Sequence, residues 1–331
     1  MTVTIGRREL LVALGGAAVA WPLAARAQQT AMPVVGILSP LVPGSAEYLL
    51  DAFRRGLGES GHVEGQNVTI DHRLAAGRFD RFPEMAADLV QRRVSVIAAF
   101  GSVAAVAAKA ATETLPILFA VTEDPVSLGL VASLSRPGGN ATGLNFFTTE
   151  VNAKRLSLLR ELVPAAARVA LLMNPMNALN TSATLKEVEP AARTLRLQIQ
   201  VFNASTSLEI DAAFAALVPW QPDALFVAPD GFFTSRRVQL AALAARYALP
   251  ATYSVRDHVE VGGLTSYGAS LVDAYRQLGT FTGRVLRGAK PGELPVVQST
   301  KFELVINAQI ARMLGLTIPA SLLALADEVI E

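Results

Sequence analysis

From Met32 onward, short apolar runs alternate with longer segments in which apolar residues recur at every third or fourth position. The short runs are typical of buried strands, and the wider spacing is typical of helices with one buried face. Segments of the second kind include AEYLLDAFRRGLGESG and SATLKEVEPAARTLR. Their regular alternation predicts parallel βαβ units, and near-continuous apolar strands predict burial on both faces of a sheet. The predicted strands lie at 34–38, 67–73, 94–100, 116–121, 141–147, 168–173, 197–203, 223–228, 250–254 and 263–268.

The pattern of strand, turn and helix occurs twice along the chain. GILSPLVPGSAEYLL (36–50) and LLMNPMNALNTSATL (171–185) each run from an apolar stretch into a small polar residue and a proline, and then into a helical pattern. LPILFAVTED (115–124) and LPATYSVRD (249–257) form a second matching pair. The repeat of roughly 110 to 130 residues is the size of a domain. The sequence therefore predicts an α/β fold with two similar open lobes, each built on a parallel sheet.

Open parallel sheets bind ligands beyond the carboxyl ends of their strands, where loops and helix N-termini meet. Two lobes that face each other would place both sets of loops around one cleft. The residues at these strand ends are therefore the candidate ligand-binding residues: Ser39, Gly101, Ser102, Thr122, Asp124, Phe146, Asn174, Asn180, Ser182, Asp230, Tyr253 and Tyr267.

Some of these residues suggest how charged groups of a ligand are held. Gly101 and Ser102 open a helix whose free N–H groups attract an anion such as a carboxylate, although Ser102 could be only the N-cap. VTEDP supplies Thr122, Glu123 and Asp124 directly after a strand, and a carboxylate there could bind an ammonium group or could cap the following segment. Asp230 is the best second-lobe candidate for an amine partner, and its alternative is again a helix cap.

Polar and aromatic side chains complete the predicted cleft. Asn174 is followed by Asn180, Thr181 and Ser182, of which one should cap a helix that begins near Ala183 while the others could bond a ligand. Aromatic residues lie at the same strand ends, and each of them could equally belong to a lobe core. Together they suggest a ligand with an apolar or aromatic part. They are Phe146, Phe147, Phe232, Phe233, Tyr253 and Tyr267.

Composition narrows the class of function. The 331 residues are 51% apolar and 17% charged with a formal net charge of +1, and they contain no long basic run. These values indicate a globular chain without a nucleic-acid-binding surface. Cysteine is absent, which excludes disulfides, thiolate metal sites and a cysteine nucleophile.

Motifs for catalysis are also missing. His62, His72 and His258 are scattered without the spacing of metal ligands, and we expect them at the surface. The chain has no GxSxG elbow and no GxxxxGK[ST] loop, and GGNATG precedes a strand instead of opening a helix. We therefore expect no enzymatic activity, no cofactor and no metal ion.

The first 29 residues have the pattern of a cleaved export signal. Arg7 and Arg8 precede an apolar run at 10–23, and ARA at 25–27 fits a cleavage site just before Gln28. The paired arginines favour the twin-arginine route, although a general secretory signal is compatible. The apolar run is short for a membrane anchor, and no later segment has 18 consecutive apolar residues.

Several segments resemble the substrate-binding proteins of ABC transporters, in the group related to tryptophan- and tyrosine-type uptake components. The resemblance covers 32–331, and its most specific part is DPVSLGLVASLSRPGGNATG. It implies the fold of type I periplasmic binding proteins, in which two Rossmann-like lobes joined by three crossovers close around a small ligand. The other matching segments are the export signal, GSVAAVAAKAAT, AKRLSLLRELVP, FFTSRRVQLAALAARY, GGLTSYGASLVDAYRQLG and FELVINAQIARMLGL.

Combined with the strand pattern, this fold predicts crossovers near 147–150, 262–264 and 292–301. The N-terminal lobe would comprise 32–147 and 264–292, and the C-terminal lobe 148–263 and 300–331. The segment SLVDAYRQLGTFTGRVLRG would be a helix returning to the first lobe, and TKFELVINAQIARMLGL a strand and helix closing the second.

The resemblance implies a periplasmic solute-binding protein that captures a small molecule, such as an amino acid or an aromatic or organic acid, for the permease of an ABC importer. Without a cysteine for a lipid, we expect a soluble, freely diffusing periplasmic monomer. Two alternatives remain open at this point. One is a periplasmic sensor of the same fold, and the other is an exported α/β enzyme.

Overall fold

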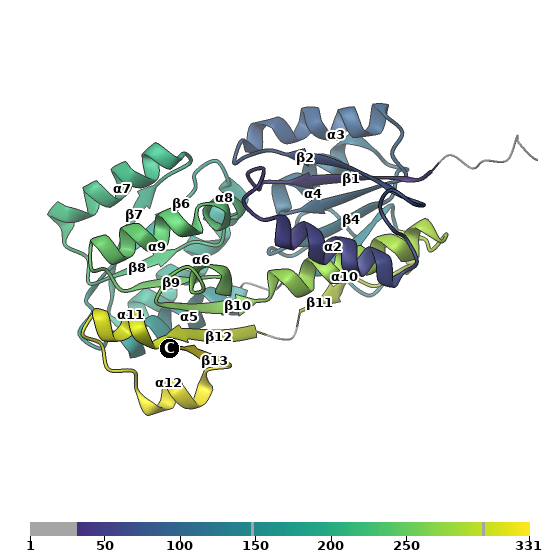
Figure 1. Cartoon of the computed structure of the whole chain (residues 1–331). Coiled ribbons are helices and arrows are strands. Elements are labelled where there is room, and N and C mark those ends of the chain that lie inside the picture. The colour runs from purple at the N-terminus through teal and green to yellow at the C-terminus, as the bar shows by residue number, and fades with distance from the viewer. Residues whose placement is uncertain (1–31, 147–148, 300–301) are drawn as a thin grey trace, which may run out of the picture. The chain divides into compact units, whose positions relative to one another are not determined.

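The computed structural model describes residues 32–146, 149–299 and 302–331. The export signal predicted at 1–29, and Phe147 among the predicted aromatic residues, lie outside these ranges. The described chain forms two lobes, each a sheet covered by helices on both faces (Figure 1). The prediction of two α/β lobes with largely parallel sheets is therefore confirmed. Within the described ranges, no helix has the length and apolar character needed to cross a membrane.

The first sheet has six strands in the order β11-β5-β4-β3-β1-β2, and all of its neighbouring strands are parallel. Helices α2 (Glu47–Glu59) and α10 (Leu271–Leu286) cover one face, and α3 (Phe82–Gln91) and α4 (Ser102–Ala111) cover the other. The strands are β1 (Val34–Ser39), β2 (Thr69–Leu74), β3 (Val96–Phe100), β4 (Ile117–Val121), β5 (Ala141–Asn145) and β11 (Val297–Gln298).

The second sheet has seven strands in the order β13-β12-β10-β9-β8-β6-β7, and only the pair of β10 and β12 is antiparallel. The strands are β6 (Arg168–Met173), β7 (Gln198–Asn203), β8 (Ala224–Val227), β9 (Ala251–Tyr253), β10 (Thr265–Ala269), β12 (Phe302–Asn307) and β13 (Glu328–Ile330). One face is covered by α5 (Thr149–Leu162), α6 (Ala178–Leu195), α11 (Ala308–Met313) and α12 (Ala320–Leu325). The other face is covered by α7 (Ser207–Trp220), α8 (Gly231–Ser235) and α9 (Arg237–Arg246).

The ten predicted strands correspond to β1 to β10, with ends that differ by at most two residues. Every residue of β3 and β4 is buried, because helices cover both faces of the sheet there. By contrast, β7 lies at the edge of its sheet, and four of its six residues are exposed. Position within the sheet thus explains why the central runs are apolar while the edge run QIQVFN is mixed.

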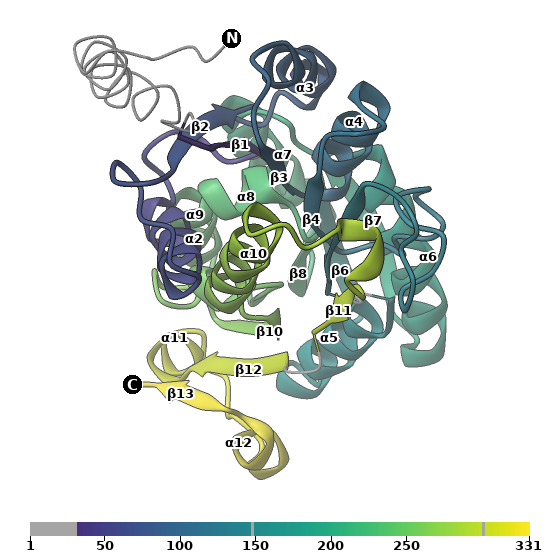
Figure 2. The same cartoon turned by 90° about the vertical axis from the view of Figure 1, so that its right-hand side faces the viewer.

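Two glycines allow α2 and α10 to pack closely, and the two helices lie side by side in both views (Figures 1 and 2). A Cβ atom on Gly56 would lie 1.7 Å from the carbonyl oxygen of Arg276, and one on Gly279 would lie 2.1 Å from that of Phe53. Only glycine leaves room for these backbones to approach. This contact fixes α10 on the first lobe, as predicted for the segment from Ser270 onward.

The chain passes from one sheet to the other three times, but two of the predicted boundaries are wrong. The predicted crossover at 262–264 is too early, since β10 pairs with β9 and β12 in the second sheet and the chain leaves it only after Ala269. The first lobe also extends beyond residue 292, because β11 pairs with β5. Residues 147–148 and 300–301, which belong to the other two predicted crossover regions, lie outside the described part of the chain.

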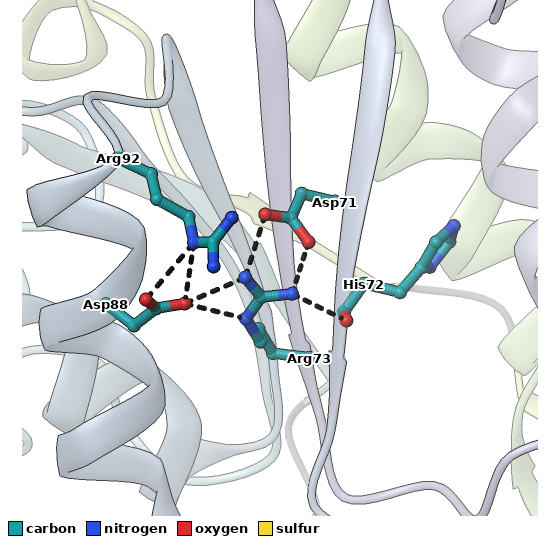
Figure 3. Close-up of polar contacts among 5 residues, drawn as sticks. All are labelled: Asp71, His72, Arg73, Asp88 and Arg92. Atoms are coloured by element: carbon teal, nitrogen blue, oxygen red, sulfur yellow. Dashed lines mark hydrogen bonds and ion pairs between the residues drawn. The ribbon is translucent and has the colours of Figure 1, made fainter.

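An ionic cluster fastens edge strand β2 to helix α3 (Figure 3). The Arg73 guanidinium pairs with Asp71 on the same strand and with Asp88 on α3, at 2.7 Å between Nη2 and Oδ2 of Asp88. Arg92 adds a second contact to Asp88 at 3.0 Å. These two guanidinium groups lower the pKa of Asp88, with the hydrogen bond from Arg73 as the largest cause. Charged side chains on an edge strand also disfavour pairing with another chain.

Candidate functional site

A cavity of about 150 Å³ lies between the two lobes. The first lobe lines it with the residues that follow β1, β3 and β4, and the second lobe with residues after β8 and β9, the end of β10 and one face of α5. The carboxyl ends of parallel strands thus meet around one space, as the general rule for open α/β sheets requires. Its position agrees with the cleft expected between two facing lobes.

Aromatic rings form much of the cavity wall. Phe100 and Tyr275 stack on each other with ring centres 3.8 Å apart and planes 9° apart, so that together they present a rigid apolar surface. Apolar contact with such rings favours a flat hydrocarbon group. The six aromatic residues that line the cavity are Phe79, Phe82, Phe100, Phe146, Tyr275 and Phe302.

On the first lobe, the main polar group of the cavity is the carboxylate of Glu123, which follows β4. The hydroxyl of Ser102 donates a hydrogen bond to its Oε2, and the hydroxyl of Thr122 donates another at 2.9 Å. The amide of Asn145 donates to the Glu123 carbonyl at 2.8 Å and holds the backbone. The other carboxylate oxygen, Oε1, is buried without a hydrogen-bond partner among the described residues. Glu123 is therefore a preoriented acceptor with one oxygen available to a ligand.

The backbone near Glu123 is shaped by Gly101. This residue has φ of +91° and occupies the N-cap position of α4, a conformation that glycine adopts without strain. Ser102 is the first residue of the helix and its side chain bonds Glu123, so the expected alternative of a Ser102 cap is wrong. The positive end of α4 thus already faces a carboxylate of the protein itself.

On the second lobe, the cavity contains a fully buried arginine. Arg155 on α5 donates from Nη2 to the carbonyl of Val227 at 3.0 Å, and its guanidinium lies 3.8 Å from the ring centre of Phe226. Nε and Nη1 are buried and have no hydrogen-bond partner in the described part of the chain. Burial lowers the pKa of Arg155 to about 9, and attraction to Glu187 opposes this shift. Two donors of a buried cation that lines the cavity therefore have no hydrogen-bond partner among the described residues.

Glu187 on α6 stands near Arg155 as its electrostatic partner. Burial raises the pKa of Glu187 to about 8, although the Asn152 amide and the Arg155 guanidinium both act to lower it. The carboxyl of Glu123 raises it further across the cavity. At neutral pH Glu187 is thus mostly protonated and does not neutralise Arg155 with a full negative charge.

Asp230 lines the cavity but is also the N-cap of α8. Its carboxylate accepts hydrogen bonds from the N–H groups of Phe232 and Phe233 at 2.9 and 3.3 Å, and from the amides of Asn174 and Asn177 at 3.2 and 2.8 Å. Burial raises its pKa, and these four donors act against that rise. The alternative of a helix cap is therefore correct, and its oxygens are more fully occupied than those of Glu123.

The structure brings half of the predicted ligand-binding residues to the cavity. Those that line it are Gly101, Ser102, Thr122, Phe146, Asn180 and Asp230. Those that do not are Ser39, Asp124, Asn174, Ser182, Tyr253 and Tyr267.

The six predicted residues outside the cavity are buried in a lobe, packed against its core or exposed on its surface. Ser39 is buried and accepts the Leu41 N–H, whereas Asp124 is exposed and caps the turn formed by the next residues. Asn174 is buried behind Asp230. Ser182 is exposed on α6, and Tyr267 packs on the core of the second lobe.

Tyr253 and His258 are both buried, although Tyr253 was predicted in the cleft and His258 at the surface. Tyr253 is fully buried and stacks on His258 with ring centres 4.5 Å apart. The expectation that all three histidines are surface residues is therefore wrong for His258, which is 2% exposed. Burial lowers its pKa to about 3.

The start of α6 also differs from prediction. The helix begins at Ala178 with Asn177 at the N-cap position, about one turn before the expected start. Asn180, Thr181 and Ser182 are therefore inside the helix and none of them caps it. The asparagine-rich segment was compatible with either start, because several of its side chains favour N-cap positions.

Sequence reasoning missed several polar residues of the cavity. Arg155 occupies an apolar position of α5, four residues after Val151 and seven before Leu162, and this break in the pattern was the available signal. VTEDP contains two acids, and the predicted set includes Asp124 instead of Glu123. The polar residues absent from the predicted set are Glu123, Asn152, Arg155, Asn177, Thr234 and Ser254.

Comparison with known proteins identifies the family of the chain. A family model described as ABC transporter substrate binding protein matches residues 34–330. The chain is 26% identical over 282 residues to a tyrosine-binding protein from Clostridioides difficile strain R20291, covering 85% of this chain and 81% of that protein.

Two solved structures are similar over nearly the whole chain. The ABC domain from Streptococcus pneumonia in complex with L-Trp has a TM-score of 0.79 and 28% identity, and covers 90% of this chain and 99% of that one. A conserved domain protein from Vibrio cholerae has a TM-score of 0.80 and 26% identity with the same coverage.

Proposed function

The chain belongs to the family of ABC transporter substrate-binding proteins, and we propose that its ligand is an aromatic amino acid or a related aromatic or organic acid, delivered to an ABC importer. The observation that carries the proposal is the cavity, in which an aromatic wall lies next to a buried arginine and a preoriented glutamate. That combination suits a small molecule with a flat apolar part and charged ends. The names of the two relatives, which bind tyrosine and tryptophan, support the same class.

We further propose that the protein is exported and acts as a soluble monomer in the periplasm, without a lipid anchor. The paired arginines, the apolar run and the ARA site at 25–27 support an export signal within residues 1–29 that is cleaved near residue 27, and they favour the twin-arginine route. The absence of cysteine supports a freely diffusing form. Mass spectrometry of protein recovered from the periplasmic fraction tests this, and a mature N-terminus near Gln28 is expected.

The proposed mechanism is closure of the two lobes around the ligand. A ligand that contacts both lobes binds the closed arrangement more tightly, and therefore shifts the population toward it. The permease would then recognise the closed pair of lobes. Contacts between the lobes, such as the hydrogen bond from Arg237 Nη1 to the Ser45 carbonyl at 2.7 Å, support a closed arrangement of this kind.

A thermal-shift and calorimetry screen of the mature protein tests the ligand class. Probes are L-tyrosine, L-tryptophan and L-phenylalanine, with L-lysine, L-glutamate and D-ribose as mismatched controls. We expect the aromatic amino acids to raise the melting temperature, because a ligand that binds only the folded state stabilises it. Binding with one-to-one stoichiometry and no product would fit a binding protein. Shifts for the mismatched compounds alone would contradict the proposed class.

A further inference from the structure

We propose that the cavity binds its ligand as a zwitterion stretched across the cleft, with the ligand carboxylate on Arg155 of the second lobe and its ammonium group on Glu123 of the first. This inference rests on the proposed function and specifies the charge pattern of the same site. It rests on a fully buried arginine and a half-buried glutamate that come from different lobes, and both line the cavity.

The first step is the unpaired hydrogen-bonding capacity of the two residues. Arg155 is fully buried, and its Nε and Nη1 have no partner among the described residues. Glu123 has both hydroxyl donors on Oε2, which leaves Oε1 buried without a partner in the same ranges. A buried charged donor or acceptor that makes no hydrogen bond costs folding energy. Such groups are retained where a ligand completes their bonds.

The second step is the orientation of the ligand. The N-terminus of α4 was the predicted site for an anion, but the carboxylate of Glu123 already receives the hydroxyl of Ser102 there. An anionic group of a ligand would meet the negative charge of Glu123 at that end. Arg155 is the cationic side chain that lines the cavity in the described residues, so the ligand carboxylate is assigned to it. Nε and one terminal nitrogen of a guanidinium match the two oxygens of a carboxylate.

The third step is the charge balance around Arg155. Glu187 is the acidic residue whose charge acts on Arg155, and burial favours the neutral form of that carboxyl at neutral pH. The guanidinium therefore keeps a net positive charge for a ligand. Because Arg155 and Glu123 belong to different lobes, a ligand bound to both also joins the lobes, which links recognition to closure.

The test uses a matched set of probes with calorimetry on the mature protein. The probes are L-tyrosine, tyramine, which lacks the carboxylate, and 3-(4-hydroxyphenyl)propanoate, which lacks the amine. We expect wild type to bind L-tyrosine at least tenfold more tightly than either of the others. An analogue that lacks one charged group leaves either Arg155 or Glu123 without its ligand partner. A site built to bond a charged group rejects such an analogue strongly.

Two variants assign the two ends. Arg155→Met should weaken L-tyrosine and the propanoate by tenfold or more and leave tyramine nearly unchanged. Glu123→Gln should weaken L-tyrosine and tyramine and leave the propanoate nearly unchanged. Lys154→Met, an exposed neighbour on α5, and Asp124→Asn, an exposed neighbour of Glu123, are the matched controls and should change none of the three affinities. Melting curves without ligand verify that each variant folds.

Three outcomes separate the possible failures. If the propanoate or tyramine binds wild type as tightly as L-tyrosine does, the zwitterion arrangement is overturned while the proposed function stands. If each variant weakens all three probes equally, Arg155 and Glu123 instead pair with each other to close the cleft, and the inference also fails. If wild type binds none of the three probes and no aromatic amino acid of the screen, the proposed ligand class itself is overturned.

Discussion

Glu123 and Asp124 are neighbours in the chain, yet only Glu123 reaches the cavity. Strand β4 ends at Val121, and Thr122 and Glu123 both line the cavity from the bend that follows it. Asp124 instead accepts the N–H groups of Val126 and Ser127, which form the next turn. The sequence VTEDP identifies the correct strand end for a carboxylate. Which of its two acids faces the cavity depends on the conformation of the bend after β4, and the motif does not specify that conformation.

At the same scale, the raised pKa of Glu187 predicts pH-dependent binding of anions. Above pH 8 the deprotonated carboxyl competes with a ligand carboxylate for Arg155. We expect the affinity for 3-phenylpropanoate, an acid without an amine, to be constant between pH 6 and 7 and to fall several-fold by pH 8.5. The charged groups that act on Glu187 are Arg155 on α5 and Glu123 after β4.

The control for this prediction is Glu187→Gln, which removes the titrating group and keeps a similar shape. Its affinity should stay nearly level up to pH 8, since the pKa of Arg155 is about 9 and its charge is lost only later. Calorimetry in buffers of different ionisation enthalpy should also show proton uptake on binding to wild type near pH 8. A wild-type profile as flat as that of the variant would contradict the assignment.

His258 predicts a second pH effect, on folding stability. Burial lowers the pKa of His258 to about 3, whereas an unfolded histidine has its ordinary value of 6.5. Between these values the unfolded chain binds the additional proton, so the contribution is present above pH 6.5 and is lost as the pH falls toward 3. We expect the melting temperature of wild type to fall more steeply between pH 6.5 and 4 than that of His258→Phe.

The phenylalanine variant keeps a ring against Tyr253 but cannot titrate. Glu187 acts in the opposite direction over pH 4.5 to 8, because its raised pKa favours the folded state at lower pH. The difference between wild type and His258→Phe cancels that effect, since Glu187 is present in both proteins. Parallel melting curves over the whole range would show that His258 is not held neutral by folding.

At the scale of elements, the contact of α2 with α10 makes a prediction about stability. Gly279→Ala would place a methyl group 2.1 Å from the Phe53 carbonyl oxygen, so the two helices would have to separate. We expect a loss of about 2 kcal/mol or more in the free energy of unfolding, in the range of overpacked contacts. Urea titration followed by circular dichroism measures it.

Gly58→Ala on α2 is the matched control. A Cβ atom there meets nothing within 4 Å, and alanine has the higher helix propensity. This variant should leave stability unchanged or raise it by up to about 1 kcal/mol. Equal destabilisation by the two substitutions would indicate that the helices do not pack as closely as the structure shows.

The elements also show what the sequence could and could not predict. The ten strands were predictable because their apolar runs are bounded by turn residues and separated by helical patterns. The partner of β10 was not, because a strand of five residues carries no signal for pairing with a strand more than thirty residues later. The same limit explains why the boundary at residue 264 failed. Side chains of the cavity that come from helix faces, such as Arg155, depend on helix orientation, which the local pattern leaves open.

At the scale of the whole molecule, three hydrogen bonds between described residues connect α2 and the loop before it to the second lobe. The Tyr48 hydroxyl on α2 donates to the Asp257 carboxylate, which lies in the 3-10 turn Arg256–His258 of the second lobe. Arg237 donates to the Ser45 carbonyl, and the Val42 N–H donates to the Ser235 hydroxyl at 3.1 Å. We call these three pairs the latch. Separation of the lobes would break all of them and return the buried Asp257 carboxylate to water.

The latch predicts that Tyr48→Phe weakens binding of every ligand by the same factor. The substitution removes the donor to Asp257 only in the closed arrangement, because in an open one water solvates the carboxylate. Burial raises the pKa of Asp257, so the closed form is the one in which the lost donor is costly. A hydrogen bond to a charged group contributes about 1.5–3 kcal/mol, which corresponds to a loss of about tenfold or more in affinity.

Calorimetry with L-tyrosine, tyramine and 3-(4-hydroxyphenyl)propanoate distinguishes this effect from those of Arg155 and Glu123. A latch variant lowers the closed population and therefore reduces all three affinities by one common factor, whereas the variants at the ends of the cavity discriminate among the probes. Tyr247→Phe, on the second lobe against Phe214, is the control and should change nothing. Small-angle scattering of the ligand-free Tyr48→Phe protein should give a larger radius of gyration than wild type. An unchanged radius together with unchanged affinities would mean that the closed arrangement is held by the cavity residues alone.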